Sequence, residues 1–296
     1  MTSTTDARPG APVALVTGAS SGIGRAAVER FRRAGWRVAA TMRRPESSDL
    51  TPSDDLRLVA LDVTAEDSVA AALAATVEAF GRLDVVVNNA GYSLNGPVEA
   101  MTPQQLRRQF DTNVLGLAAV TRHALPHLRA SQGTVVNISS IGGRLAFPFG
   151  AAYHGTKWAV EGLSDALRFE LRPHGVRVRV VEPGAIRTDF YDRSMAWAEH
   201  PAYEPHLSAM RELSDRAGAG APGPEPVAET IYRAATSRGG RLRWPVRPGP
   251  FLLLHRVLPD ALWRRALSAT LEREVRRRAG AAAAGSAAGV PGGAPG

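Results

Sequence analysis

Short apolar runs rich in β-branched residues recur along the first two thirds of the chain. Several are apolar at consecutive positions, which is typical of strands buried on both faces of a parallel sheet. A further run near the end of this pattern is predicted to close the sheet. The predicted strands lie at residues 13–17, 37–41, 57–63, 84–89, 134–139, 176–183 and 242–246.

Longer segments with helical periodicity separate these strands. Strands that alternate with helices through right-handed crossovers form a doubly wound sheet. We therefore predict an α/β fold with a doubly wound parallel sheet, helices on both of its faces and a C-terminal helical extension. The predicted helices lie at residues 22–34, 65–80, 103–129 with a break near Asn113, 153–172 and 226–236.

The rest of the chain departs from this alternation. Residues 190–225 hold four prolines and a Gly/Ala run, which predicts a mobile excursion outside the core. We predict one domain over residues 12–250, a basic amphipathic helical extension at 251–278, and disordered ends at 1–11 and 279–296. The extension carries an apolar stripe at four-residue spacing, formed by Trp263, Leu267, Leu271 and Val275.

Composition and charge distribution argue against several classes of function. The net charge of +8 is concentrated between Arg238 and Arg278, where 11 arginines face three acids, so the predicted core is balanced and nucleic acid is not an expected partner. The chain has no cysteine and its histidines show no paired metal spacing, so we expect no disulfide and no metal site. Without an export signal or a long apolar run, a cytoplasmic location is expected.

A glycine-rich turn follows the first predicted strand and opens the first predicted helix. Its glycines are Gly18, Gly22 and Gly24 in "TGASSGIG". Such a turn lets the backbone approach a pyrophosphate and directs the positive end of the helix at it. A side chain there would collide with the ligand or require an unfavourable φ. A simple tight loop is the alternative interpretation.

Six motifs occur in order between residues 12 and 190. They are the glycine turn, "NNAG" at 88–91, Asn113, Ser140, Tyr153 with Lys157, and "PG" at 183–184. Together they resemble the short-chain dehydrogenase/reductase family. The resemblance implies a Rossmann-type single domain, a bound nicotinamide cofactor and carbonyl/alcohol redox chemistry. The stretch around Tyr153 resembles the hydroxysteroid-dehydrogenase-like branch of that family.

Lys157 is the only lysine of the chain, and it follows Tyr153 by four residues. Residues at this spacing are neighbours on one helical face. A tyrosine has an ordinary pKa near 10 and is a poor base at neutral pH, whereas a nearby ammonium favours its phenolate form. The resemblance implies that Lys157 also hydrogen-bonds the nicotinamide ribose, a task for which a compact ammonium suits better than a guanidinium.

Two more residues complete the predicted catalytic set of Asn113, Ser140, Tyr153 and Lys157. By resemblance, Ser140 stabilises the developing alkoxide and Asn113 holds a water in a proton relay through Lys157. Ser139 is the alternative to Ser140, but adjacent strand residues point to opposite faces of a sheet. Tyr153 is predicted to donate or remove the substrate proton.

The end of the second predicted strand indicates which dinucleotide binds. In the family an acid there binds the adenosine ribose, but this chain has Met42 followed by Arg43 and Arg44. Two cations without the acid favour the 2′-phosphate of NADP(H) over NAD(H), unless the arginines are merely solvated. The resemblance implies that the cofactor contacts Gly18, Ser20, Ser21, Gly22, Ile23, Gly24, Arg43, Arg44, Asp62, Val63, Asn89, Ala90, Gly91, Tyr153, Lys157, Pro183, Gly184, Ile186 and Thr188.

We therefore predict an NADP(H)-dependent oxidoreductase that interconverts a secondary alcohol and a ketone or aldehyde on an apolar small molecule. The alternative is a non-catalytic dinucleotide-binding sensor or scaffold with the same fold. We expect a homodimer or homotetramer, and we consider peripheral membrane contact through the C-terminal helix as well as packing of that helix on a partner subunit. The apolar residues of the excursion are Phe190, Tyr191, Met195, Trp197, Tyr203 and Met210.

Overall fold

A seven-stranded parallel sheet forms the centre of the computed structural model, which describes residues 10–188 and 194–288, with side chains up to residue 281. Every strand predicted from the sequence is present, and the predicted α/β fold with a doubly wound parallel sheet is confirmed. In spatial order the strands are β3 (Leu56–Ala60), β2 (Arg37–Met42), β1 (Val13–Thr17), β4 (Val85–Asn88), β6 (Thr134–Ile138), β7 (Arg177–Pro183) and β9 (Arg243–Val246).

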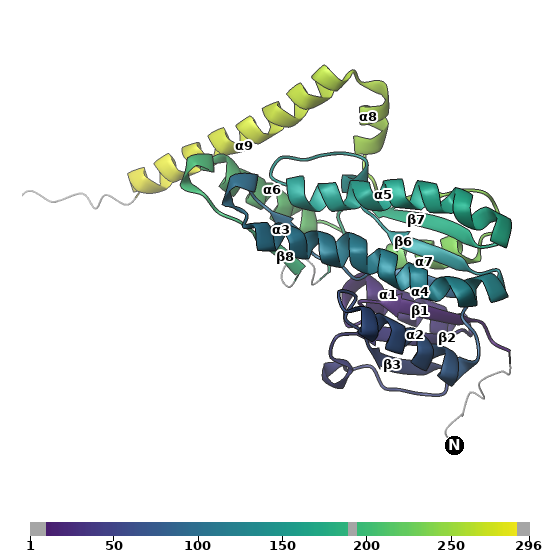
Figure 1. Ribbon diagram of the computed structural model, residues 1–296. Coiled ribbons are helices and arrows are strands. Elements are labelled where there is room, and N and C mark those ends of the chain that lie inside the picture. Colours follow the sequence, from purple (N-terminus) through teal and green to yellow (C-terminus); the bar gives the residue numbers. More distant parts are fainter. Residues whose placement is uncertain (1–9, 189–193, 289–296) are drawn as a thin grey trace, which may run out of the picture.

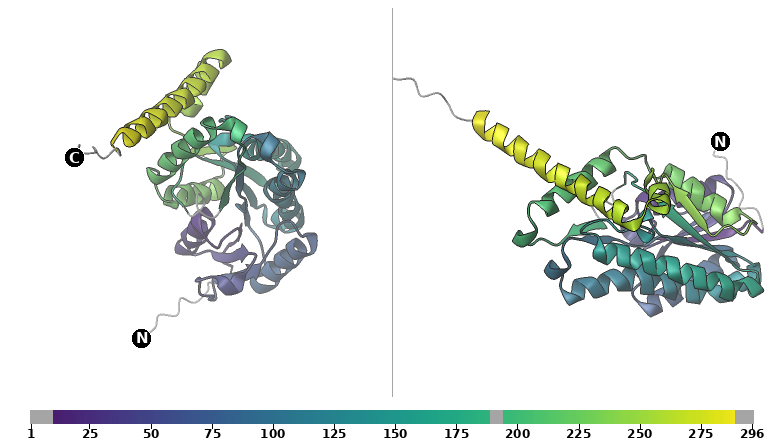
Figure 2. Two further views of the ribbon diagram at one scale, coloured as in Figure 1. Left: turned by 90° about the vertical axis from the view of Figure 1, so that its left-hand side faces the viewer. Right: turned by 90° about the horizontal axis from the view of Figure 1, so that it is seen from above.

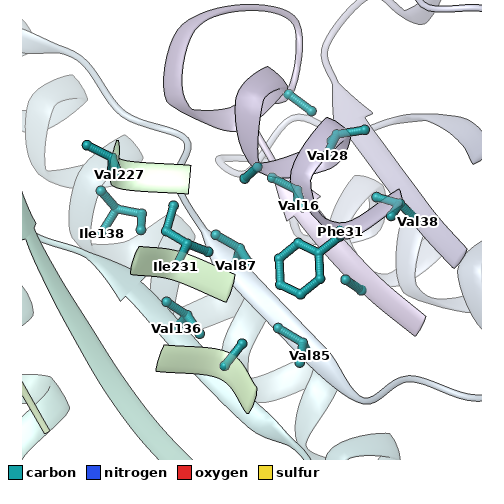
Figure 3. Close-up of a cluster of buried hydrophobic side chains, with 14 of the residues drawn as sticks. Val16, Val28, Phe31, Val38, Val85, Val87, Val136, Ile138, Val227 and Ile231 are labelled. Atoms are coloured by element: carbon teal, nitrogen blue, oxygen red, sulfur yellow. The ribbon is translucent and has the colours of Figure 1, made fainter. Parts of the chain in front are cut away.

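Helices cover both faces of this sheet (Figure 1). On one face, α1 (Gly22–Arg33) and α7 (Glu225–Thr236) bury apolar side chains against the strands, including Phe31 and Ile231 (Figure 3). On the other face, α2 (Glu66–Phe80), α4 (Gly116–Ser131) and α5 (Ala151–Leu171) form a second cluster of buried residues. The strands are therefore buried from both sides, as their continuous apolar runs predict.

The long predicted helix at 103–129 is interrupted where the sequence indicates. It divides into α3 (Pro103–Phe110), the π-helical segment η3 (Asp111–Leu115) and α4. Thr102 begins α3 with a capping box, because its hydroxyl accepts from the Gln105 N–H and the Gln105 side chain accepts from the Thr102 N–H. π-Helical turns inside α-helices are frequent at functional sites.

The region predicted as an excursion contains regular structure that the sequence analysis missed. Strand β8 (Met195–Trp197) pairs in parallel with β5 (Ser93–Asn95), and α6 (His206–Ala219) follows. The prolines that argued against order lie at the borders of α6, at positions 205 and 222, and leave a helix-forming segment between them. Residues 206–219 therefore form a helix, which the sequence analysis did not predict. Residues 189–193, with Phe190 and Tyr191, lie outside the described residues.

Two helices form the C-terminal extension, α8 (Phe251–Val257) and α9 (Asp260–Ala288). Helix α9 packs beside α6 and projects beyond the sheet (Figures 1 and 2). Arg216 of α6 is paired with Glu274 of α9, and Arg278 Nη1 lies 2.9 Å from Glu212 Oε2. Since α9 continues to Ala288, the prediction of disorder from residue 279 is wrong up to that point.

The apolar stripe of α9 has its partner within the chain. Trp263 is 6% exposed, and Leu267, Leu271 and Val275 are half-buried. Within the extension, the large apolar side chains that are exposed lie on α8 and at the start of α9: Phe251, Leu253, Leu254, Val257 and Leu262. Among the described residues, no helix combines the length and the apolar character needed to cross a membrane.

Candidate active site

The glycine turn joins the end of β1 to the start of α1. Gly18 and Gly22 have φ angles of +64° and +53°, which favour glycine. Gly24 has a different reason: a Cβ there would lie 2.2 Å from the carbonyl oxygen of Gly18. The chain itself, and not only a ligand, therefore requires glycine at this position.

Helix α1 begins without a side-chain cap, unlike α3. Its N-cap residue, Ser21, forms no side-chain hydrogen bond to the helix, and the first turn contains no acid. The N–H groups of that turn stay available to an anion, which the helix dipole also favours. This arrangement fits the pyrophosphate of a dinucleotide.

Thr17 and Asn89 lock the turn to the neighbouring strand. The hydroxyl oxygen of Thr17 accepts from the backbone N–H groups of Asn89 and Ala90, both at 2.9 Å. The Asn89 amide donates to the carbonyl oxygens of Thr17 at 2.9 Å and Gly18 at 3.1 Å. Sequence analysis assigned no structural role to Thr17, because its partners lie more than 70 positions away.

A cavity of about 1200 Å³ opens at this edge, where the strand order changes direction between β1 and β4. Ligands bind at such switch points in doubly wound sheets. Of the predicted site residues, Gly24, Arg44 and Asn113 lie outside its lining. The cavity brings together Gly18, Ser20, Ser21, Gly22, Ile23, Arg43, Asp62, Val63, Asn89, Ala90, Gly91, Ser140, Tyr153, Lys157, Pro183, Gly184, Ile186 and Thr188.

Tyr153 and Lys157 share one face of α5 and both line the cavity. The Lys157 Nζ atom lies 5.7 Å from the centre of the Tyr153 ring and donates to the Ile138 carbonyl oxygen at 2.8 Å. Burial lowers the pKa of Lys157 to about 8, and the charge of Glu161 opposes this change. The ammonium thus keeps its charge at neutral pH but holds it weakly.

Ser140 and Ser139 are separated by the structure, as their alternation predicts. The Ser140 Oγ atom lines the cavity and accepts from the Gly142 N–H at 3.0 Å. The Ser139 hydroxyl is buried toward Gly143, where an added Cβ would lie 2.4 Å from it. Both serine residues line the cavity, but the Ser139 hydroxyl is buried and has no hydrogen-bond partner among the described residues.

Asn113 stands in the π-helical segment η3, 2% exposed. Its side chain accepts from the Tyr92 N–H at 3.1 Å and donates to the Tyr92 carbonyl oxygen at 2.9 Å. It also donates to the Thr156 hydroxyl at 3.1 Å. Asn113 therefore fixes the chain after Gly91 to helix α5, a contact that the sequence does not predict.

Arg43 and Arg44 surround a smaller cavity of about 400 Å³ next to the glycine turn. Neither has an ion-pair partner in the part of the chain that the structure describes. Met42 is 4% exposed and packs into the core. Sequence analysis missed the other polar residues of this cavity, which are Arg25, Ser47, Ser48 and Asp49.

Asp62 also lines the large cavity. The Thr64 backbone N–H and hydroxyl donate to its carboxylate at 2.9 and 2.7 Å. These hydrogen bonds hold the pKa of Asp62 below its ordinary value, so the carboxylate stays ionised at neutral pH. Such an acceptor fits the polar edge of an adenine ring, as the resemblance implies.

The opposite end of the large cavity is lined by apolar and aromatic side chains. Met195, Trp197 and Met210 of the predicted set lie here, whereas Tyr203 donates to Glu99 at 2.9 Å and is outside the lining. Sequence analysis missed further members, which come from five separate segments: Tyr92, Phe147, His154, Leu213 and Phe251.

His154 connects this wall to the catalytic helix. Its ring lies 5.6 Å from Tyr153 and 5.7 Å from Phe147, which in turn lies 5.8 Å from Phe251 of α8. Burial lowers the pKa of His154 to about 4, so the ring is neutral at neutral pH. Among the described residues, no group of His, Asp and Glu side chains is arranged to hold a metal ion.

Comparisons with known proteins agree with this geometry. The chain matches the family described as short chain dehydrogenase over residues 12–199. It is 34% identical over 280 residues to the uncharacterized oxidoreductase YusZ of Bacillus subtilis, a match that covers 88% of this chain and 98% of YusZ. A short-chain dehydrogenase from Streptomyces avermitilis superposes with a TM-score of 0.77 at 37% identity, and covers 90% of this chain and 98% of its own.

Two more distant structures contain dinucleotides. A 3-ketoacyl-(acyl-carrier-protein) reductase from Brucella melitensis, complexed with NADH, has a TM-score of 0.67 at 27% identity and covers 79% of this chain and 96% of its own. A short chain dehydrogenase from Burkholderia cenocepacia, in complex with NADP, has a TM-score of 0.69 at 25% identity and covers 88% and 97%. Our chain therefore belongs to the short-chain dehydrogenase/reductase family and is an oxidoreductase that uses a nicotinamide dinucleotide.

Proposed function

We propose that this enzyme uses NADP(H) to interconvert a secondary alcohol and a ketone or aldehyde on an apolar small molecule. One observation carries the proposal: Ser140, Tyr153 and Lys157 line the same cavity as the glycine turn. A phenol, a hydroxyl and an ammonium are thereby placed beside a site whose backbone suits a dinucleotide.

Each side chain of the site has its own role in the proposed reaction. The dinucleotide, when bound, supplies or accepts the hydride. Tyr153 gives a proton to the substrate oxygen during reduction and removes it during oxidation. Ser140 donates a hydrogen bond to the same oxygen, and the charge of Lys157 favours the phenolate form of Tyr153. Asn113 holds the chain after Gly91 in place against α5.

Arg43 and Arg44 support the choice of NADP(H). They line a cavity beside the first turn of α1, at the end of β2, and neither forms an ion pair with an acid among the described residues. A 2′-phosphate would place two negative charges there and accept several hydrogen bonds. Structural relatives with either NADP or NADH exist, so the relatives alone do not determine the preference.

The far end of the cavity supports an apolar substrate. Trp197, Met210 and Phe251 lie on three separate elements that converge on the region beyond Tyr153. Apolar walls with few polar groups are typical of sites for hydrophobic small molecules. Methionine side chains also adapt to irregular shapes.

Turnover of a panel of apolar ketones with NADPH tests this function. We expect Tyr153→Phe to lower kcat by a factor of about 10² to 10⁴, because proton transfer by a positioned side chain contributes on this scale. Tyr203→Phe, which lies outside the cavity, should turn over like the parent enzyme. A Tyr153→Phe variant as active as the parent contradicts the mechanism. NADPH binding without turnover of any ketone would support the non-catalytic sensor instead.

We also propose that two copies associate through α5. Trp158 and Phe169 are 52% and 72% exposed on this helix, and Leu115 of the adjacent segment η3 is 60% exposed. Exposed apolar groups of this size mark interaction sites, and most homo-oligomers use a twofold interface. Light scattering should show a dimer or tetramer for the parent and a smaller species for Phe169→Glu. An unchanged mass in that variant contradicts this interface.

Helix α8 supports contact with an anionic membrane surface. None of its seven residues is buried, and it is followed by arginines such as Arg265 that have no acidic partner in the described part of the chain. A second copy would bring the same positive charges, so an anionic bilayer is the better match for this surface. Cosedimentation with vesicles that contain phosphatidylserine should disappear when residues 250–296 are removed. Equal binding by both forms contradicts the contact.

A further inference from the structure

Four ionisable side chains follow one another along a single face of α5. They are Tyr153, Lys157, Glu161 and Asp165, each four positions after the last. Residues at this spacing are neighbours on a helix. The first two line the cavity, whereas the two carboxylates lie behind it, and the proposed reaction gives them no role.

Glu161 is buried, with 6% of its surface exposed. Its Oε2 atom accepts from Arg243 Nε at 2.9 Å. Its Oε1 atom has no hydrogen-bond partner among the described residues. A buried carboxylate with an unsatisfied oxygen is unfavourable, so its retention in a core position calls for a compensating role.

Arg243, on the edge strand β9, joins the carboxylates of this region. It donates to Asp165 as well as to Glu161, and its Nε atom lies 3.6 Å from Glu182 Oε1 on β7. Arg144 approaches Glu182 from the other side, with 3.2 Å between Nη1 and Oε1. Together with Lys157, three cations and three anions form a balanced cluster.

The same anchoring keeps Glu161 from capturing Lys157. No ion pair within 4.0 Å joins these two side chains among the described residues. The Lys157 ammonium donates instead to the Ile138 carbonyl oxygen at 2.8 Å. It therefore remains at the cavity, where the hydroxyl oxygens of a dinucleotide ribose can accept hydrogen bonds from its other N–H groups.

Without forming an ion pair, the Glu161 carboxylate can still favour the protonated form of Lys157. Lys157 is buried, and burial disfavours its charged form. A fixed negative charge one helical turn away favours the charged form, and the interaction is stronger in the protein interior than in water. Removing that charge would leave the buried ammonium between the uncharged Ile138 carbonyl and Tyr153 ring, without a negative charge one helical turn away.

We propose that Glu161 is a positioning residue for Lys157: its carboxylate, anchored by Arg243, keeps the ammonium charged without pairing with it. The value of this arrangement for catalysis rests on the proposed function, because it preserves a free, protonated lysine beside Tyr153. The electrostatic relationship itself does not require turnover and is tested separately.

The unusual composition of the chain makes a direct test available. Because Lys157 is the only lysine, a full-length chain labelled with ¹³C-lysine gives one side-chain signal, and its titration by NMR reports the pKa of Lys157. We expect Glu161→Gln to lower this pKa by about one pH unit. Glu170→Gln removes an exposed carboxylate from the same helix and should leave the pKa unchanged.

Two further measurements separate charge from packing. Glu161→Asp keeps the charge and should retain most of the parent pKa, whereas a fall as large as that in Glu161→Gln overturns the proposal. An unchanged pKa in Glu161→Gln also overturns it. If Glu161→Gln does not fold, Glu161→Met, which fills the same buried space with an apolar side chain, takes its place: the same fall in the pKa of Lys157 is expected, and an unchanged pKa overturns the proposal. A shifted pKa in a chain that reduces no ketone would leave this inference standing and contradict only the proposed function.

Discussion

The Lys157 ammonium is fixed by the backbone of Ile138, at the end of the strand that precedes the catalytic segment. The donor and acceptor atoms are 2.8 Å apart, and Lys157 is 7% exposed. This contact sets the position of the only ammonium side chain in a protein that otherwise uses guanidinium. The Ile138 carbonyl also limits the space for a side chain larger than lysine at this position.

A substitution that preserves the charge tests this limit. We expect Lys157→Arg to lower kcat by a factor of about 10² or more, because the larger planar group cannot occupy the same space between Ile138 and Tyr153. Initial rates with saturating NADPH measure the effect, and a melting curve checks that the variant is folded. If Lys157→Arg has the rates and the pH profile of the parent, a positive charge at this position is sufficient for catalysis, and the size of the group does not matter.

The arginines beside the glycine turn should determine cofactor preference. We expect the double variant Arg43→Ala, Arg44→Ala to raise KM for NADPH by a factor of about 10 to 100, and to change KM for NADH little, because only NADPH carries the 2′-phosphate. Met42 is a poorer position for this test since it is buried in the core. Equal effects on both cofactors would show that the arginines do not recognise the phosphate.

Two glycines of the chain should respond oppositely to alanine. At Gly24 an added Cβ lies 2.2 Å from the Gly18 carbonyl oxygen, so Gly24→Ala should displace the turn and abolish dinucleotide binding. Gly162, on α5, has no atom within 4 Å of such a Cβ, and Gly162→Ala should stabilise the fold by about 0.5–1 kcal/mol. NADPH fluorescence and thermal melting measure the two effects. Parent-like binding by Gly24→Ala would contradict this account of the turn.

Glu182 should make stability depend on pH. Burial, together with repulsion from Glu161, raises the pKa of this carboxyl to about 6, against the attraction of Arg144 and Arg243. Since the folded pKa exceeds the unfolded value, the stabilisation is complete below about pH 4.5 and is lost as the pH rises through 6. Glu182→Gln mimics the protonated form.

We therefore expect Glu182→Gln to raise the free energy of unfolding by about 1–2 kcal/mol at pH 7.5 and to change it little at pH 4.5. Urea denaturation at the two pH values measures this difference. A variant that is less stable than the parent at pH 7.5 would show that the arginines outweigh the burial of the carboxylate.

Local sequence patterns were sufficient to predict much of the fold. Short apolar runs, several of them continuous, predicted all seven strands of the main sheet, and the break expected near Asn113 is the π-helical segment η3. The relation of Tyr153 to Lys157 was also predictable, because four-residue spacing on a helix fixes which side chains are neighbours. Helix α6 was missed because nearby prolines concealed a segment with ordinary helix-forming residues.

Contacts between residues far apart in the sequence could not be predicted from local patterns. Thr17 meets Asn89 across 72 positions, and Arg243 meets Glu161 across 82. Similarly, the stripe containing Trp263 was recognisable as apolar, but only the fold shows that Trp263 packs on the rings of Phe251 and His255 of α8 and that Leu253 stays exposed.

The order of residues by itself determined the periodicity of each element, the glycine turn and the pairing of a phenol with a single ammonium, because these depend on backbone geometry over a few residues. Only the tertiary structure decided which charges are buried together behind that ammonium and which apolar faces stay open. Burial and electrostatic partners depend on chain segments far apart in sequence, and their meeting is a property of the packed molecule.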